Sequence, residues 1–361
     1  MLSSVAIPRA MRAAVLYDVD DLRIEERAVP SLEPGDVLVR TGASGICSGD
    51  LMPWYVRRKA PFVLGHEPAG TVVALQSEDD DDELLGARVF AHHHAPCLTC
   101  ALCSRGDFVQ CAHWRATSLD PGGMAEFFRV PRANVAELLI LPDDMSFVAG
   151  SLIEPLACVV KSLTRGGAKI AHPTDAAFDL GLANRSVYVV GLGVMGLMHV
   201  ALAVALGAAV FASDLLPERR ALASALGAGA FEPDAAIGVL KEATLTGGAD
   251  IVVCGPGDGT ALQHSVAAAG PGGTVVMFSP IEPNERFLLD QASAYFRDLR
   301  LVASYSCGPR DTARARDLLS VGLLEPGELG LETAPLNGVS ELYRRMREAE
   351  IVKGVVTFDG E

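Results

Sequence analysis

The stretch SVYVVGLGVMG, residues 186–196, decides the fold of the second half of the chain. Its first five residues form an unbroken apolar run, typical of a strand buried on both faces of a parallel sheet. The run passes directly into a glycine-rich loop and a helical pattern, an order that favours a dinucleotide site because the glycines let a pyrophosphate approach the positive end of the helix dipole. A plain turn that packs the helix on the strand is the alternative. The expected cofactor contacts are Gly191, Gly193, Val194, Met195 and Gly196.

The segments around this loop continue the pattern. Residues 209–214, 250–254 and 273–279 read as further strands, and 197–208 and 217–229 as helices that end in glycine. This alternation predicts a parallel α/β sheet. Asp214 ends the second strand, where an acid accepts hydrogen bonds from the ribose hydroxyls and repels the 2′-phosphate of NADP, so NAD is the expected cofactor. Arg219 is a further candidate cofactor contact, although Arg219 and Arg220 lie in a helical pattern that favours solvated side chains.

Short strand patterns punctuated by glycine and proline run from residue 11 to about residue 155 and predict a compact, mostly β domain. With 361 residues the chain suits two domains rather than one core. Two helical patterns at 311–322 and 339–350 and a last strand at 353–360 are expected to pack on the first domain. The expected domains are therefore 1–155 with 305–361, and 156–304. Residues 165–185 receive no assignment.

Cys97, Cys100, Cys103 and Cys111 are separated by two, two and seven residues. The N-terminus lacks the basic and apolar build of a signal peptide, so we expect a cytoplasmic protein whose thiols stay reduced. Four thiols on one short loop then predict a closed tetrahedral zinc site rather than two disulfides. An iron–sulfur cluster is the main alternative, disfavoured because no Cys-Pro follows the third cysteine and no second such run exists.

Cys47, in GICSGD, and His66 and Glu67, in VLGHEPAG, form a second metal-binding candidate. A cysteine, a histidine and an acid make a mixed ligand set with room for an open position, unlike the closed thiolate loop. Taken singly, Cys47 could equally be a small core residue and His66 a turn residue. The histidine run at 92–94 is interpreted as a strand end, with adventitious metal binding as the alternative.

The segments GICSGD, GHEPAG, PGGMAEFFRVP, IEPLACVV and GLGVMG, with the four-cysteine lobe, resemble the zinc-containing medium-chain alcohol and polyol dehydrogenase family over nearly the whole chain. The resemblance implies an α/β fold class, in which a Rossmann doubly wound parallel sheet holds NAD and a mostly β GroES-like catalytic domain holds a catalytic zinc ion. It implies Cys47 and His66 as zinc ligands, with Glu67 and Glu154 as the acids that complete or flank the site. The Glu-Pro-Leu at Glu154 is similar to the sorbitol and threonine dehydrogenase branch.

The sequence departs from the family pattern where the substrate proton leaves. The pattern has Ser or Thr two residues after the ligand cysteine and His three residues beyond, whereas this chain has Gly49 and Met52. Ser48 comes one residue early. Because successive residues of an extended segment point to opposite sides, we expect Ser48 to face away and water to carry the proton, with a Ser48 relay as the alternative. Asp50 matches the pattern and is expected to be a structural hydrogen-bonding residue near the metal.

These features predict an enzyme that transfers a hydride from a secondary alcohol, polyol or related hydroxyl compound to NAD. Its catalytic residues would be Cys47, Ser48, His66, Glu67 and Glu154. One alternative is a zinc-free quinone or enone reductase of the same fold, although such enzymes generally lack the ligand cysteine and the cysteine lobe. The other is a non-catalytic zinc protein that binds NAD.

The composition disfavours nucleic acid and membrane as partners. A formal net charge of −15 disfavours nucleic acid, and no apolar stretch reaches membrane-spanning length without glycine, proline or charge. The acidic run at 78–83 is interpreted as a solvated loop. A small hydroxyl compound is the expected partner, with Trp54, Tyr55 and Tyr305 as candidate pocket residues. A homodimer or homotetramer is expected.

Overall fold

The structure, a computed structural model, describes residues 7–76 and 82–358. Most of the acidic run at 78–83 therefore lies outside the described residues. The chain packs as two compact units, of which the first comprises Met1–Pro155, Cys307–Ser320 and Gly330–Glu361 and the second Leu156–Ser306 and Val321–Leu329. Residues 321–329, which the sequence analysis assigned to the first domain, pack with the second unit.

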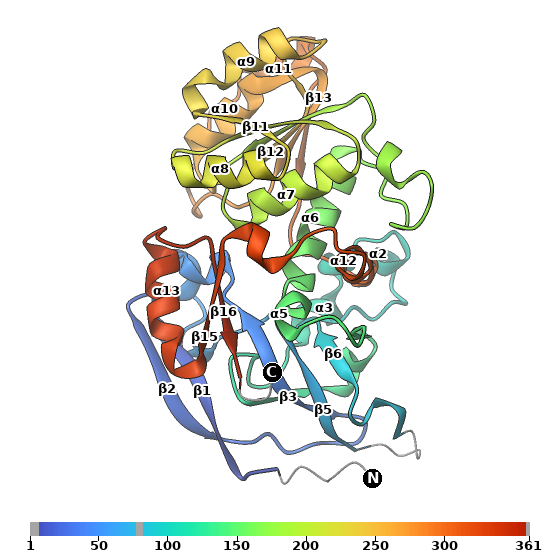
Figure 1. Cartoon of the computed structure of the whole chain (residues 1–361), viewed down its shortest axis with the longest axis vertical. Coiled ribbons are helices and arrows are strands. Elements are labelled where there is room, and N and C mark those ends of the chain that lie inside the picture. The colour runs from blue at the N-terminus through green and yellow to red at the C-terminus, as the bar shows by residue number, and fades with distance from the viewer. Residues whose placement is uncertain (1–6, 77–81, 359–361) are drawn as a thin grey trace. The chain divides into compact units, whose positions relative to one another are not determined.

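The second unit is built on a parallel sheet of six strands in the spatial order β11-β10-β9-β12-β13-β14 (Figure 1). The strands are β9 Ser186–Val190, β10 Ala209–Ser213, β11 Gly229–Phe231, β12 Ala249–Cys254, β13 Ala269–Met277 and β14 Arg300–Ala303. The winding reverses between β9 and β12, and ligands of such open sheets bind at the carboxyl ends of the strands beside this switch. The order confirms the predicted doubly wound α/β sheet.

The helices associated with this sheet are α6 Ile153–Gly166, which begins in the first unit, α7 Val194–Ala205, α8 Pro217–Ala225, α9 Ala236–Ala243, α10 Gly259–Ala268 and α11 Gln291–Phe296. Short 3-10 turns lie at Phe178–Leu180, Pro233–Ala235 and Pro326–Leu329. Gly207 and Gly227 follow α7 and α8 with φ of 81° and 99°, the left-handed conformation that ends helices. The core beneath these helices includes Tyr188, Val252 and Leu262.

The first unit contains a sheet in the order β15-β16-β3-β5-β6-β8, with β7 also paired to β3, and a smaller sheet in the order β2-β1-β4. The strands are β1 Ala10–Asp18, β2 Asp21–Ala28, β3 Val37–Gly45, β4 Phe62–Val63, β5 Pro68–Leu75, β6 Arg88–Ala91, β7 Phe127–Val130, β8 Leu138–Ile140, β15 Leu331–Pro335 and β16 Lys353–Thr357. These elements confirm the predicted mostly β character of this part of the chain.

The helical segments of the first unit are mostly short. They are α1 Pro53–Val56, α2 Ala101–Ser104, α3 Ala112–Ala116, α4 Arg132–Val135, α5 Phe147–Ser151, α12 Pro309–Ser320 and α13 Val339–Arg347, with 3-10 turns η1 Ser48–Leu51, Asp82–Leu84, Phe108–Gln110 and Leu336–Gly338. Figure 1 shows α13 beside β15 and β16, and its residues Leu342 and Tyr343 share a core cluster with Val356.

The register of β3 brings three distant parts of the chain together. In the antiparallel pairs, Ser44 lies opposite Pro68 of β5, and Gly45 lies opposite Val355 of β16. The residues just after β3, just before β5 and at the start of β16 therefore meet at one end of the sheet. Cys47, His66 and Lys353 come from these three places.

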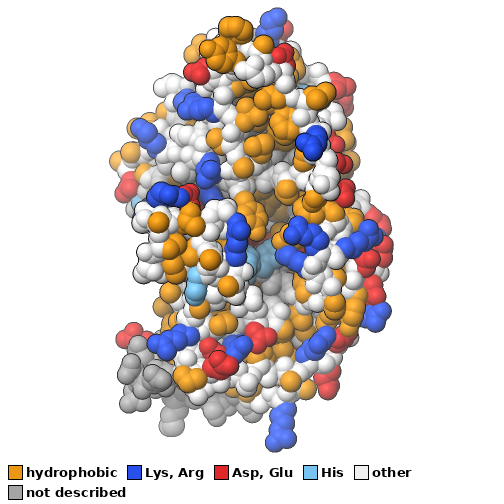
Figure 2. Space-filling model, turned by 180° about the vertical axis from the view of Figure 1, so that it is seen from behind, with side chains coloured by type: hydrophobic (Ala, Val, Ile, Leu, Met, Phe, Trp, Pro, Cys, Tyr) orange, Lys and Arg blue, Asp and Glu red, His pale blue; other side chains and the backbone are white. Residues whose placement is uncertain are grey.

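Within the described residues, no helix combines the length and the apolar character that crossing a membrane requires. On the face shown in Figure 2, both acidic and basic side chains of the described residues are exposed.

Candidate functional site

The four cysteines of the lobe converge on one point. The sulfur atoms of Cys100 and Cys103 lie 3.5 Å apart, those of Cys100 and Cys111 3.8 Å, and those of Cys111 and Cys97 3.6 Å. All four lie within 4.8 Å of one another. A tetrahedral zinc ion with Zn–S bonds of about 2.3 Å holds its sulfurs about 3.8 Å apart, whereas a disulfide needs about 2 Å. The sulfur positions therefore fit a zinc ion and not a disulfide.

The electrostatics of the lobe also favour a cation among the four sulfurs. Hydrogen bonds from Thr99 lower the pKa of Cys97 to about 5, whereas burial, followed by the neighbouring thiols, raises the pKa of Cys103 to about 12. Sulfurs this close together cannot all lose their protons unless a positive charge compensates them. A zinc ion supplies that charge, so the chemistry of the donor set agrees with its geometry.

The lobe is held by apolar packing. Phe108, Val109 and Trp114 pack with the cysteines in one buried cluster. Gly308, at the start of α12, lies so close to Phe108 that a Cβ atom there would come within 2.6 Å of the ring. The lobe thus rests against a segment that returns from the end of the chain, and its shape does not depend on the metal alone.

Cys47, His66 and Glu67 form the second set whose ligand atoms lie within 4.8 Å of one another. Cys47 is the N-cap of η1, and its sulfur accepts a hydrogen bond of 3.3 Å from the Gly49 N–H. Nδ1 of His66 lies 3.5 Å from Oδ2 of the buried Asp50. Burial alone would lower the pKa of His66, but the charges of Cys47 and Asp50 raise it well above its ordinary value. These anionic neighbours favour a cation among them, so the set fits a zinc ion with an open position.

Glu67 has a partner that the sequence analysis missed. Its carboxylate accepts a hydrogen bond from Nζ of Lys353, at the start of β16, and both side chains are 1% exposed. The same ammonium donates to the Ile46 carbonyl at 2.9 Å. A Cβ atom on Gly45 would lie 2.0 Å from Glu67 Oε2, so the carboxylate has no room to move on that side. Lys353 therefore neutralises and fixes Glu67.

Glu154 lies in a different set from Cys47 and His66. Its carboxylate shares a group of ligand atoms within 4.8 Å with His92 and His93. Cys307 lies 4.0 Å from Glu154 Oε1 and 3.6 Å from His92 Nε2, and all of these residues except His93 are fully buried. Burial opposes protonation of His92, but the charge of Cys307, together with hydrogen bonding to Cys307 and Glu137, raises its pKa to about 10. The histidine run is thus more than a strand end, because two of its members contribute to this buried polar cluster.

The proton-relay region differs from the expectation in its backbone. Ser48–Leu51 form a 3-10 helix and not an extended segment, so successive side chains are about 120° apart instead of opposite. The premise on which Ser48 was expected to face away is therefore wrong. A Cβ atom on Gly49 would lie 3.5 Å from the Cys47 sulfur, an ordinary contact, so this position faces the candidate metal site and has room for a side chain. Asp50 is 2% exposed, and its carbonyl accepts a 2.6 Å hydrogen bond from Tyr343.

The glycine loop of the second unit has the geometry that a dinucleotide needs. Gly191 has a φ of 83°, and a Cβ atom on Gly196 would lie 2.0 Å from the Gly191 carbonyl oxygen, so both positions need glycine. Gly193 has open space where a Cβ atom would point, and it is the N-cap of α7. Val194 and Met195 form the first turn of that helix. The free N-terminal end of α7 can therefore receive a pyrophosphate.

Asp214 follows β10 and lies against this loop. Its Oδ2 accepts a 2.6 Å hydrogen bond from the Leu192 N–H, and its Oδ1 one of 2.9 Å from the Leu216 N–H. Each carboxylate oxygen can accept a second bond, so ribose hydroxyls remain possible partners. The expectation of solvated arginines was wrong: Arg219 and Arg220 are each 18% exposed at the side chain, Arg219 lies 3.9 Å from Asp214, and Arg220 donates to the Asp214 carbonyl.

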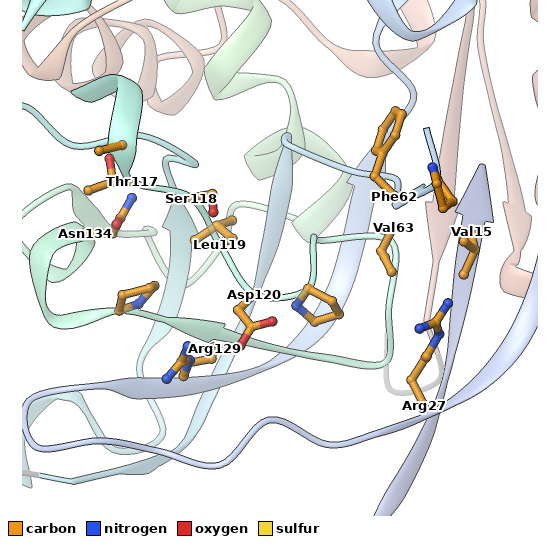
Figure 3. Close-up of a pocket in the computed structure, with 14 residues that line it drawn as sticks. Val15, Arg27, Phe62, Val63, Thr117, Ser118, Leu119, Asp120, Arg129 and Asn134 are labelled. Carbon is orange, nitrogen blue, oxygen red and sulfur yellow. Dashed lines mark ion pairs between the residues drawn. The ribbon is translucent and has the colours of Figure 1, made fainter. Parts of the chain in front are cut away.

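A pocket of about 630 Å³ in the first unit is separate from these groups. Figure 3 shows Phe62 and Val63 on one side, Ser118 and Leu119 on another, and Arg129, which pairs with Asp120 at 3.0 Å, below them. The lining includes neither the predicted metal ligands nor the predicted cofactor contacts. The size of this pocket is therefore no argument for catalysis there.

Comparison with known proteins accounts for both units. Residues 33–143 match the family described as alcohol dehydrogenase GroES-like domain, and residues 194–320 match the family described as zinc-binding dehydrogenase. The chain is 30% identical over 293 residues to sorbitol dehydrogenase of Bacillus subtilis, covering 77% of this chain and 78% of that protein. It is 31% identical over 263 residues to L-threonine 3-dehydrogenase of Symbiobacterium thermophilum, covering 70% of each.

Solved structures agree. A putative zinc-binding dehydrogenase from Sinorhizobium meliloti, bound to NADP, superimposes with a TM-score of 0.82 at 28% sequence identity, covering 96% of this chain and 99% of that one. The resemblance found in the sequence is thereby confirmed, together with its Rossmann and GroES-like fold class. The chain belongs to the zinc-binding medium-chain dehydrogenase family, whose members named above are oxidoreductases acting on CH–OH groups.

Proposed function

We propose that this protein oxidises a secondary alcohol, polyol or related hydroxyl compound with NAD, using one catalytic and one structural zinc ion. The observation that carries the proposal is the different character of two of the metal-capable sets. Cys97, Cys100, Cys103 and Cys111 form a closed set of four sulfurs, whereas Cys47, His66 and Glu67 form a mixed set of three. A closed set suits a structural ion, and a three-ligand set leaves a position for substrate.

In this proposal Cys47, His66 and Glu67 hold the catalytic zinc ion, and Glu154 flanks it. When bound, zinc supplies Lewis acidity that lowers the pKa of a hydroxyl group, and NAD supplies the hydride acceptor. The protein fixes the ligands: the Gly49 N–H orients the Cys47 sulfur, and Lys353 holds Glu67. Asp50 lies beside His66 Nδ1 and keeps the imidazole oriented toward the set.

For the substrate proton we propose a water route. Gly49 supplies no hydroxyl at the position that faces the Cys47 sulfur, where a Cβ atom would fit at 3.5 Å. In a 3-10 helix, Ser48 lies about a third of a turn away from that direction. Because Gly49 leaves space beside the Cys47 sulfur, we propose that water carries the proton there and that Ser48 takes no part in the transfer.

For the cofactor we propose NAD over NADP. The Asp214 carboxylate would meet the adenosine ribose, and its charge repels a 2′-phosphate. Arg219, 3.9 Å from Asp214, is the nearby cation that would have to swing away from this carboxylate to hold such a phosphate. The bound NADP of the Sinorhizobium meliloti structure belongs to that protein, and the ratio of kcat/KM for the two cofactors decides the question for this chain.

The test of the function combines turnover with metal content. Purified protein should contain close to two zinc ions per chain and should reduce NAD with at least one member of a panel of polyols, sugars, L-threonine and simple alcohols. His66→Ala should leave a folded protein with about one zinc ion and little activity. A protein that binds NAD but turns over no hydroxyl compound would support the non-catalytic alternative, and one that is active without zinc would support the quinone reductase alternative.

We also propose a homo-oligomer, either a dimer or a tetramer, in the cytoplasm. Leu288, Tyr295 and Phe296 of the second unit are 83%, 72% and 84% exposed, which is unusual for large apolar side chains and supports self-association. The described residues contain no disulfide bond, which agrees with a reducing compartment. Light scattering on the eluting protein measures the number of subunits.

A further inference from the structure

Three consecutive cations, Arg57, Arg58 and Lys59, lie in the segment that connects Cys47 to His66. The chain as a whole carries 30 Lys and Arg residues and 45 Asp and Glu residues, so its overall charge is negative. A run of three cations between two proposed metal ligands therefore has the opposite charge to the chain as a whole. The backbone of the segment is well fixed. Val56 is fully buried, and its carbonyl accepts hydrogen bonds of 2.9 Å from both Lys59 N–H and Ala60 N–H.

Lys59 is oriented by aromatic side chains. Its Nζ donates to the Tyr55 hydroxyl at 2.5 Å and lies 3.9 Å from the centre of the Tyr55 ring and 6.0 Å from that of Phe62. These contacts hold the ammonium group in one place without neutralising it. An ammonium group has three donors, so two remain for another ligand.

The three cations differ in whether they are paired. Arg57 lies 3.3 Å from the Asp18 carboxylate. Among residues 7–76 and 82–358, no carboxylate lies within ion-pair distance of Arg58 or Lys59. Arg58 and Lys59 are therefore exposed cations whose charge is available to a ligand, whereas the charge of Arg57 is already matched.

The unpaired cations belong to the same hydrogen-bonded segment as the candidate metal ligand Cys47. The Gly49 N–H donates to the Cys47 sulfur at 3.3 Å, and the Gly49 carbonyl accepts a 3.2 Å hydrogen bond from the Met52 N–H. The Met52 carbonyl in turn accepts hydrogen bonds of 3.0 Å from the N–H groups of Tyr55 and Val56. This continuous series of hydrogen bonds, which ends at the Val56 carbonyl, fixes Tyr55, Arg58 and Lys59 relative to Cys47.

We propose that Lys59 and Arg58 bind an anionic group, a phosphate or a carboxylate, on the hydroxyl compound that the enzyme oxidises, with Tyr55 holding the Lys59 ammonium in position. The inference rests on the proposed dehydrogenase function and narrows its substrate class. The remaining Lys59 donors and the forked Arg58 guanidinium match the oxygens of such a group. Two unpaired cations also attract an anion toward the site in a chain that otherwise repels it.

Two matched substrate pairs test this proposal. A hexitol is compared with the same hexitol carrying one phosphate, and 2-butanol is compared with 3-hydroxybutanoate, in which a carboxylate replaces the terminal methyl group. We expect one of the two anionic compounds to exceed its neutral partner in kcat/KM by tenfold or more. Lys59→Met and Arg58→Met should each reduce this ratio about tenfold to a hundredfold, the effect of a lost charge-assisted hydrogen bond. Tyr55→Phe should reduce it severalfold, mainly through KM.

Arg57→Met is the control, because it removes the same charge from the same segment at a residue that is already paired. It should leave the ratio within about twofold, since the loss of an exposed ion pair has little effect. A second readout is calorimetric titration of the enzyme, with NAD bound, by inorganic phosphate, whose affinity should fall in Lys59→Met and not in Arg57→Met.

The outcomes separate the inference from the function on which it rests. Turnover of neutral polyols with no preference for either anionic partner would overturn the anion site and leave the dehydrogenase function standing. Equal losses in Arg57→Met and Lys59→Met would also overturn it, because the effect would then be the general charge of the segment. If no hydroxyl compound reduces NAD, the proposed function fails, and phosphate affinity in wild type and Lys59→Met alone decides the anion site.

Discussion

Replacing Lys353 by methionine tests a charge pair in which both side chains are almost completely buried. Methionine keeps the length and apolar stem of lysine but removes the ammonium group that bonds to Glu67 and to the Ile46 carbonyl. Both side chains of the pair are 1% exposed, and Gly45 closes one side of the carboxylate. Water therefore cannot take the place of the lost ammonium group, and in the protein without a catalytic zinc ion the charge of Glu67 is left uncompensated.

The expected loss is large for one substitution. Removing one partner of a buried ion pair costs about 3 to 5 kcal/mol, because it leaves an uncompensated charge in a medium of low dielectric constant. At about 2 to 4 °C per kcal/mol for a unit of this size, the midpoint of thermal unfolding should fall by roughly 6 to 20 °C. Zinc content should fall too, since Lys353 fixes one of the proposed ligands.

The assay is thermal and urea unfolding, both followed by circular dichroism, with zinc measured on the same samples. The double variant Lys353→Met with Glu67→Gln should recover much of the loss, because no unpaired charge remains and the residual cost is about 1 to 2 kcal/mol of lost hydrogen bonds. Arg345→Met is the surface control: its pair with Glu332 is 29% and 44% exposed, and its removal should cost less than about 1 kcal/mol. A Lys353→Met protein as stable as this control, with full zinc, would refute the reasoning.

Four further substitutions test the other parts of the proposal. Cys100→Ser should lower zinc from about two ions to one and reduce stability, because binding at a structural zinc site is coupled to folding. Asp214→Ser should narrow the NAD to NADP ratio of kcat/KM, since it removes a repulsive charge without adding a phosphate partner. Ser48→Ala should change turnover less than about threefold, and a loss near a hundredfold would instead identify a relay. Burial lowers the pKa of His199 from 6.5 to about 4. Between these two values the unfolded chain binds more protons than the folded one, so the free energy of unfolding falls as the pH drops. His199→Gln should remove up to about 3 kcal/mol of this loss, measured by unfolding at a series of acidic pH values.

The Rossmann sheet could be predicted from sequence because its signals are local. β9 is one continuous apolar run, the loop glycines follow it directly, and Gly207 and Gly227 end α7 and α8 in the left-handed conformation. The four-cysteine lobe is local as well, since all its ligands fall on one short loop. In each case the residues that interact are close in sequence, and the pattern of residue types is sufficient.

The remaining features depend on contacts between distant residues. Lys353 and Glu67 are 286 positions apart, and Cys307 and His92 are 215 positions apart. No spacing rule connects such residues, because strand register brings them together. The 3-10 turn at Ser48–Leu51 was missed for a different reason: a run of four residues carries too little periodicity to distinguish a tight helix from an extended segment.

One signal in the sequence did point to the buried pair. Lys353 begins the apolar stretch KGVVT, and a lysine inside a strand of this kind either lies at the surface or needs a buried partner. The antiparallel pairing of β16 with β3, and of β3 with β5, brings residues near Ile46 and Glu67 to this end of β16. The same three strands deliver Cys47 and His66, so the pair and the proposed ligand set have one structural origin. A substitution that shifts the register of β3 should therefore disturb the ion pair and the metal site together, and not one without the other.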